Sequence, residues 1–195
     1  ALAGAAWAAV VALLRARATG EGAHVDVSTT EGVLALLALP LGIAAARGTP
    51  VARGTELLTG GAACYGVYRT KDGRFVALGA LEPKFFAAFC AAAGRPDLVD
   101  RQMEDGGAGP RAELEALFAV RTREEWAAFA AEHDVCLAPV LEGDEPRSDP
   151  QLRARGAFVE VPTPYEGKAM PGVASPVRLR GEEEAPRRPA PRLGE

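Results

Sequence analysis

Apolar residues dominate the first 46 positions in two blocks whose spacing predicts helices. Residues 1–19 (ALAGAAWAAVVALLRARAT) are followed by a glycine, a typical helix stop, and a second apolar helix is expected over 28–46. Ser28 and Glu31 stand in the spacing of a capping box at its start. Between the two helices, residues 23–28 (AHVDVS) alternate in the manner of a short strand. The order helix, strand, helix predicts part of a layered α/β domain.

The middle of the chain switches between strand and helix signals. Two β-rich runs flank the turn Lys71-Asp72-Gly73, which predicts a hairpin. Thr122 and Glu125 form a second capping box. Three helices are expected after the hairpin, over 83–93, 110–120 and 123–133. The rest of the pattern predicts a buried strand at 134–141, one or two helical turns at 149–156, and strand-like pieces at 157–162 and 173–179.

Two segments lack such periodicity. Residues 47–64 (RGTPVARGTELLTGGAAC) are rich in Gly and Thr and form a long connection, of a kind that is often functional. Residues 181–195 combine prolines with charges, including the acidic run 182–184. An extended or frayed tail is expected there.

The net charge and the lengths of the apolar segments argue against two classes of binding partner, nucleic acids and membranes. A formal net charge of -4 and a pI near 5.4 argue against a surface that binds nucleic acid or anionic membranes. The apolar segments are shorter than a membrane span or are broken by Pro40, and they are not expected to follow a signal peptide. We therefore expect a cytoplasmic protein with neither a nucleic acid nor a membrane as partner.

The cysteines and histidines give little support to a metal centre. Cys64, Cys90 and Cys136 are odd in number and widely spaced, and no CxxC pair occurs. His24 and His133 are the only histidines. Neither a zinc site nor a disulfide framework is expected, and a reducing cytosol fits this cysteine usage.

The sequence pattern gives no simple structural explanation for one carboxylate, that of Glu82. Gly60-Gly61 lacks the Lys-Ser/Thr ending of a phosphate loop, so a turn that needs positive φ is expected there. Tyr65, at the entrance of the hairpin, suits packing on a sheet face. Glu82, however, directly precedes Pro83 at a helix start, where Ser, Thr, Asp or Asn would cap the helix better.

Several segments together resemble CoA-transferase family III, in this order and at similar spacing: HVDVSTTEGV, YGVYRTKDGRFVALGALEPKFF, RTREEWAAFAAEHDVCLAPVL and SDPQLRARGAF. The stretch GTELLTGGAACYGVYRTKDGRFVALGALEPKF resembles more narrowly the α-methylacyl-CoA racemase branch, and GALEPKF is its discriminating piece. The resemblance implies an α/β fold, namely the C-terminal portion of a two-domain architecture that normally forms an interlocked homodimer. It divides the chain into the end of the large domain (1–46), an interdomain connection (47–64), an α+β small domain (65–148) and a segment returning to the large domain with the Pro-rich tail (149–195).

The resemblance also implies a chemistry. Racemases of this branch interconvert the R and S forms of 2-methylacyl-CoA thioesters through an enolate, with a histidine and an aspartate as bases. Glu82 matches a glutamate that hydrogen-bonds the histidine, and the positive end of the helix dipole favours its negative charge. The implied contacts to the acyl substrate are Tyr65, Leu57, Leu58, Gly60 and Gly61. Coenzyme A would enter as part of the acyl-CoA substrate, with no separate cofactor and no metal.

Two departures leave the acyl preference open. The family's loop often carries an acid where Thr59 stands, and a proline followed by an aromatic residue where Ala63-Cys64 stand. The histidine and aspartate of the family would both precede Ala1, so this chain alone is expected to lack racemase activity. Two alternatives remain at this level: a CoA-transferase of the same fold, working through an aspartyl-CoA intermediate, and a non-catalytic interaction domain. The last predicts a stable monomer without a large exposed apolar patch.

Overall fold

The structure is a computed structural model that describes residues 2–163, 168–177, 181, 189–191 and 194 of the 195-residue chain. It divides into two compact units, 1–138 and 139–195. Most of the expected tail, including the acidic run 182–184, lies outside the described residues, as does the end of the expected strand at 173–179.

Three helices form the first part of the chain: α1 (Leu2–Thr19), α2 (Thr29–Leu36) and α3 (Ala38–Arg47). The Ser28 hydroxyl accepts a hydrogen bond from the Glu31 amide at 3.2 Å, which is one half of the expected capping box. The single helix expected over 28–46 is wrong, because α2 and α3 meet at a bend of 54°. Pro40 has no N–H to donate to the carbonyl four residues earlier, which explains a break at this point.

The strand expected at 23–28 does not form. No strand within the described residues pairs with it, and both Val25 and Val27 are exposed. An alternating pattern produces a strand only where a neighbouring strand accepts and donates its backbone hydrogen bonds, so the local signal was not sufficient.

The first three helices expose many apolar side chains. Trp7 is 72% exposed, Leu13 64% and Leu36 81%. Among the described residues no single helix is long and apolar enough to cross a membrane, although α2 and α3 together meet that test of length and composition as a bent pair.

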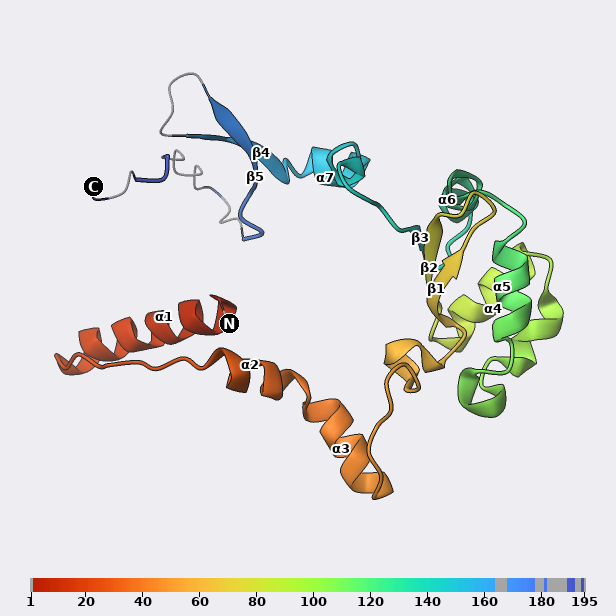
Figure 1. Cartoon of the computed structure of the whole chain (residues 1–195), viewed down its shortest axis with the longest axis horizontal. Helices are drawn as coiled ribbons and strands as arrows, with labels where there is room; N and C mark the ends of the chain where they lie inside the picture. The colour runs from red at the N-terminus through yellow and green to blue at the C-terminus, as the bar shows by residue number, and fades with distance from the viewer. Residues whose placement is uncertain (1, 164–167, 178–180, 182–188, 192–193, 195) are drawn as a thin grey trace. The chain divides into compact units, whose positions relative to one another are not determined.

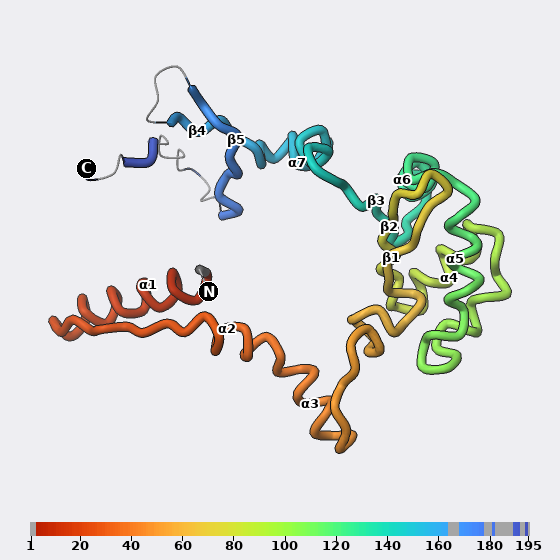
Figure 2. Tube along the Cα trace, viewed as in Figure 1, coloured from red at the N-terminus to blue at the C-terminus, as the bar shows by residue number. Residues whose placement is uncertain are grey.

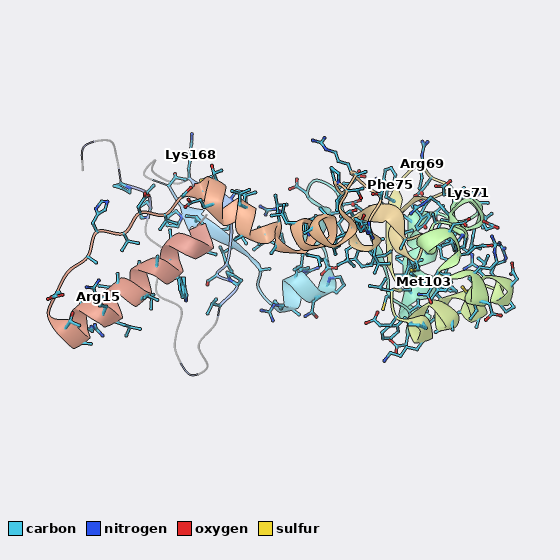
Figure 3. All side chains as sticks on the ribbon, turned by 90° about the horizontal axis from the view of Figure 1, so that it is seen from below. Arg15, Arg69, Lys71, Phe75, Met103 and Lys168 are labelled. Atoms are coloured by element: carbon cyan, nitrogen blue, oxygen red, sulfur yellow. The ribbon has the colours of Figure 1, made fainter. Side chains whose placement is uncertain are left out.

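A three-stranded sheet lies at the centre of the segment from residue 62 to 138. Strands β1 (Tyr65–Arg69) and β2 (Phe75–Gly79) form the expected antiparallel hairpin, and β3 (Leu137–Pro139) adds to β2. The Thr70 amide donates to the Arg74 carbonyl at 2.8 Å and closes the turn, in which Gly73 has φ +77°. Arg69, Lys71 and Phe75 gather at this turn (Figure 3).

Helices follow the hairpin and cover one face of the sheet (Figure 1). They are α4 (Pro83–Ala92), α5 (Arg111–Phe118) and α6 (Arg123–Glu132), with the 3₁₀ turns η2 (Pro96–Arg101) and η3 (Glu104–Gly107) between α4 and α5. The chain path then returns from α6 to the sheet as β3 (Figure 2). The capping box expected at α6 is confirmed, since Thr122 and Glu125 each accept the other's backbone N–H.

A cluster of aromatic rings fills the space between this sheet face and the helices. The Tyr68 ring from β1 stacks on Phe118 of α5 at 4.7 Å between centroids, and Phe118 lies 4.9 Å from Trp126 of α6. Phe89 of α4 lies 5.5 Å from Phe118, and Phe129 of α6 packs edge-on against Trp126 at 5.2 Å. The buried indole of Trp126 donates its N–H to the Phe118 carbonyl at 3.0 Å, so this polar group keeps a partner. The core explains the i, i+3 and i, i+4 apolar spacing of the three helices.

The second unit contains η4 (Glu145–Arg147), the short helix α7 (Pro150–Ala154) and the antiparallel strands β4 (Phe158–Pro162) and β5 (Ala169–Val173). The helical turns expected at 149–156 and the strand expected at 157–162 are therefore confirmed. The second strand was expected at 173–179 but lies at 169–173. Its register places Val173 opposite Phe158. Beyond the strand, the Ser175 hydroxyl donates a hydrogen bond to the Val177 carbonyl at 3.0 Å. Pro176 has no backbone N–H with which to continue the strand pairing.

Candidate functional site

Both faces of the hairpin carry apolar residues. Tyr68, Val76 and Leu78 point into the aromatic core and are buried. The opposite face carries Tyr65 and Val67 of β1, which are exposed. An antiparallel sheet with one solvated face normally alternates apolar with polar residues, so an apolar outer face here calls for a ligand or a partner.

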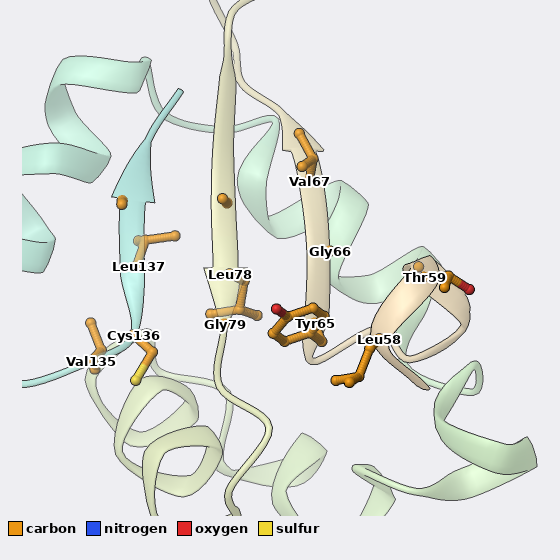
Figure 4. Close-up of a pocket in the computed structure, with 13 residues that line it drawn as sticks. Leu58, Thr59, Tyr65, Gly66, Val67, Leu78, Gly79, Val135, Cys136 and Leu137 are labelled. Carbon is orange, nitrogen blue, oxygen red and sulfur yellow. The ribbon is translucent and has the colours of Figure 1, made fainter. Parts of the chain in front are cut away.

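A hollow of about 820 Å³ lies on this outer face, with the turn η1 (Leu57–Gly61) as its wall. Its volume falls in the range of small-molecule sites. None of the residues that line it carries a charge (Figure 4): Leu58, Thr59, Gly60, Tyr65, Gly66, Val67, Ala77, Leu78, Gly79, Val135, Cys136, Leu137 and Ala138. Such a lining suits the hydrocarbon part of a ligand.

The wall of the hollow needs glycine at two adjacent positions. Gly60 has φ +105°, a conformation that only glycine adopts without strain, and the expected positive φ is confirmed there. At Gly61 the reason is a close approach, because an added Cβ would lie 2.2 Å from the Thr55 carbonyl oxygen. Glu56 and Thr59 exchange backbone and side-chain hydrogen bonds across the turn. The turn is therefore internally fixed.

Arg111 of α5 fastens this wall to the rest of the unit. Its Nη2 donates to the Gly60 carbonyl at 2.5 Å and reaches the Gly61 carbonyl at 3.4 Å. The guanidinium also lies 6.0 Å from the centre of the Tyr68 ring. The sequence pattern did not identify Arg111, because nothing local relates it to a turn some 50 residues earlier.

The structure brings together three of the five residues expected to contact an acyl chain. Leu58, Gly60 and Tyr65 line the hollow. Leu57 and Gly61 belong to the same turn but do not line it. The other lining residues were not expected to contact an acyl chain, and Val67, Ala77, Gly79 and Cys136 are among them. Of these four, only Gly79 could have been recognised from the sequence, because a glycine inside a strand can mark a close approach.

Glu82 lies three residues beyond the end of β2 and does not line the hollow. It is the residue before the first turn of α4, with an extended backbone and Pro83 directly after it. Its backbone carbonyl accepts the amides of Phe85 and Phe86 at 3.0 and 3.2 Å. Its exposed carboxylate caps no backbone N–H, and no hydrogen bond or ion pair of that carboxylate is observed in the described part of the chain. The side chain is free to meet another group.

The histidines offer no base in this arrangement. His133 ends α6, and its ring lies 4.6 Å from that of Phe129, whereas His24 lies in the exposed segment before α2. No cluster of three or more His, Cys, Asp or Glu side chains that could hold a metal ion occurs within the described ranges. Burial raises the pKa of the Tyr68 phenol to about 12, with Arg111 acting in the opposite direction. Tyr68 is therefore a neutral donor, and it hydrogen-bonds the Ala63 carbonyl.

Comparison with known sequences identifies relatives of two activities. The profile of CoA-transferase family III matches residues 2–195. Human α-methylacyl-CoA racemase is 31% identical over 152 residues, which are 77% of this chain and 40% of that protein. The acetyl-CoA:oxalate CoA-transferase of Acetobacter aceti is 30% identical over 195 residues, or 94% of this chain and 47% of that protein. The chain thus spans less than half the length of these relatives.

Solved structures share the fold. The protein Rv3272 from Mycobacterium tuberculosis matches with a TM-score of 0.72 and 21% identity, covering 94% of this chain and 49% of that one. A CaiB/BaiF family protein from Brucella suis matches with a TM-score of 0.65 and 20% identity, covering 92% of this chain and 47% of that one. The α/β architecture expected from the sequence is confirmed, as a portion of a longer fold.

Proposed function

Because the chain belongs to CoA-transferase family III, we propose that it forms part of an enzyme that racemises 2-methylacyl-CoA thioesters. The enzyme removes the α-proton to give an enolate and returns the proton to either face, which interconverts the R and S forms. Coenzyme A enters with the substrate, and no other cofactor takes part. The working unit in this proposal is a cytoplasmic homodimer.

The free carboxylate of Glu82 carries the proposal. A glutamate at this position is a poor helix cap, and its side chain makes no hydrogen bond or ion pair within the described residues. In the proposed mechanism it accepts a hydrogen bond from the histidine base, fixes the tautomer and orientation of the ring, and stabilises its protonated form. The histidine and the aspartate belong to the part of the fold that this chain does not span. The similarity to human α-methylacyl-CoA racemase supports this assignment.

The apolar hollow accommodates the acyl chain in this proposal. Leu58 and Tyr65 form its sides and the outer face of β2 forms its floor. An apolar floor contributes binding energy in proportion to the hydrocarbon area it removes from water. That energy is independent of the stereochemistry at the α-carbon, so R and S thioesters are held alike.

A CoA-transferase is the second candidate, and one observation favours it. The similarity to the oxalate CoA-transferase extends over 94% of this chain, against 77% for the human racemase. Such an enzyme would pass CoA between carboxylic acids through an aspartyl-CoA intermediate. A stand-alone interaction domain is disfavoured by the exposed apolar side chains of α1 to α3.

The two enzyme activities are separated by one experiment in D₂O. The longest open reading frame product that contains this chain is incubated with (S)-2-methyldecanoyl-CoA, and deuterium at the α-carbon is followed by NMR. A parallel reaction contains a free carboxylic acid as acceptor, and new thioesters are identified by mass spectrometry. Deuterium exchange with loss of stereochemical purity is the expected result. CoA transfer without exchange would overturn the racemase in favour of the transferase. The 195-residue chain alone is expected to show no exchange.

A further inference from the structure

Gly79 is a strand glycine that neither its backbone nor its neighbours require. Its φ lies outside the left-handed region that favours glycine. A Cβ built at this position would meet only the Cys136 carbonyl oxygen at 3.7 Å and the Cys136 Cβ at 3.9 Å, which are ordinary van der Waals distances. Glycine weakens a strand, and where the backbone does not need it, it often marks the close approach of a ligand or of another backbone segment.

The register of the hairpin shows where the absent side chain would point. Val76 and Leu78 of β2 face the aromatic core, so Gly79 faces the outer side of the sheet. It lies directly opposite Tyr65 on β1, and both residues line the hollow. The Tyr65 ring turns toward this end of β2 (Figure 4). Any side chain at position 79 would rise into the floor of the hollow beside that ring.

We propose that Gly79 determines acyl-chain length: the space above it admits medium and long acyl chains, and a larger residue would restrict the enzyme to short ones. This inference rests on the proposed function, since the occupant is the acyl chain of the thioester. The lining supports that choice of occupant, because it is mostly apolar and carries no charged side chain for a polar ligand. The carbons of the chain furthest from the thioester lie over Gly79 and the rest lie between Leu58 and Tyr65.

Substitution at position 79 tests the inference without disturbing the backbone. Gly79→Val places an isopropyl group in the floor of the hollow. Valine suits a strand better than glycine, so the variant is expected to fold. Gly79→Ala fills less and serves as a second, milder variant. Phe75→Val is the matched control, because position 75 lies on the same strand and the same sheet face but does not line the hollow.

Binding to the longest open reading frame product that contains this chain is measured by calorimetry with acetyl-CoA and decanoyl-CoA, the latter below its critical micelle concentration. Wild type is expected to prefer decanoyl-CoA. Gly79→Val should weaken decanoyl-CoA binding about tenfold, as when roughly two methylenes lose their contacts, and leave acetyl-CoA binding unchanged. Gly79→Ala should have a smaller effect in the same direction, and Phe75→Val none.

The inference is overturned if Gly79→Val keeps the wild-type ratio of the two affinities, or if wild type shows no preference for the longer chain. The second outcome includes the case in which another copy of the chain covers the hollow. Failure of the proposed function is a separate result. A chain-length preference that depends on position 79, without α-proton exchange in the D₂O experiment, would keep the inference and reject the racemase.

Discussion

The guanidinium of Arg111 donates a hydrogen bond to the Gly60 carbonyl oxygen at 2.5 Å, and this contact ties the wall of the apolar hollow to helix α5. A second, longer contact reaches the Gly61 carbonyl at 3.4 Å. Because Gly60 has a positive φ, its carbonyl points away from the direction that a regular helical turn would give it. Arg111 supplies the donor that this carbonyl lacks within η1. The shape of the hollow therefore depends on a residue that does not line it.

Arg111→Met keeps much of the side-chain volume and removes both hydrogen bonds. We expect the free energy of unfolding to fall by roughly 1–3 kcal/mol, the usual contribution of a hydrogen bond to a charged group. The amides of η1 should exchange with solvent faster, and decanoyl-CoA should bind several-fold more weakly. Chemical denaturation, hydrogen exchange and calorimetry measure these three effects.

Arg101→Met is the matched control for that variant. Arg101 pairs with Glu104 and Glu113 at 2.6 Å and does not line the hollow. These side chains are partly exposed, and ion pairs open to solvent contribute little, so the loss of Arg101 should cost less than about 1 kcal/mol and leave decanoyl-CoA binding unchanged. Equal effects of the two substitutions on ligand affinity would contradict the positioning role of Arg111.

The buried phenol of Tyr68 makes stability depend on pH in the alkaline range. Burial raises its pKa from 10.0 to about 12 in the folded chain, so the folded state holds this proton more tightly than the unfolded state. The resulting stabilisation is present below pH 10 and is lost as pH rises toward 12. Tyr68→Phe removes the ionisable group. Between pH 10 and 12 the melting temperature of wild type should fall relative to that of Tyr68→Phe. A difference in melting temperature that stays constant over this range would contradict a raised pKa of Tyr68.

Local rules predicted the segment from residue 62 to 138 well because its signals are local. The turn at Lys71-Asp72-Gly73 and the capping box of Thr122 and Glu125 each lie within a few residues, and both formed as expected. The break between α2 and α3 was also available from the sequence, since Pro40 cannot bond to the carbonyl four residues earlier. The strand expected at 23–28 failed because a strand needs a partner, and periodicity does not report one.

The candidate site was predicted only in part, for the same reason. Tyr65, Leu58 and Gly60 were identified through the family resemblance rather than through spacing, and they do converge on one hollow. Arg111 was missed because its contact spans about 50 residues of sequence. Gly79 was missed although an unexplained glycine in a strand is a recognisable signal.

Cys136 provides a chemical probe of the hollow. Cys64 and Cys90 are fully buried, and burial raises the pKa of the Cys90 thiol to about 11, whereas Cys136 is partly exposed and lines the hollow. The folded chain should therefore react with N-ethylmaleimide first at Cys136, as peptide mass spectrometry would show. Decanoyl-CoA should slow that reaction and acetyl-CoA should not. Equal protection by both ligands would mean that the acyl chain binds elsewhere.

Glu82 allows the structural and the functional roles of a carboxylate to be separated by two substitutions. It stands at the cap position of α4 but its side chain makes no capping hydrogen bond. Asp is one of the best residues at such a position, so Glu82→Asp should gain a cap and up to about 1 kcal/mol of stability. The shorter side chain would at the same time withdraw the carboxylate from the proposed histidine.

We therefore expect Glu82→Asp to raise the melting temperature and to lower α-proton exchange, two effects in opposite directions. Glu82→Gln should leave stability within about 0.5 kcal/mol of wild type, since the side chain is exposed and has no partner to lose. It should slow exchange at least about a hundredfold, because an amide supports a protonated imidazole poorly. Exchange and melting are measured on the longest open reading frame product that contains the chain. If Glu82→Asp and Glu82→Gln both exchange at the wild-type rate, Glu82 does not orient the base, and its position before Pro83 is only a feature of the helix start.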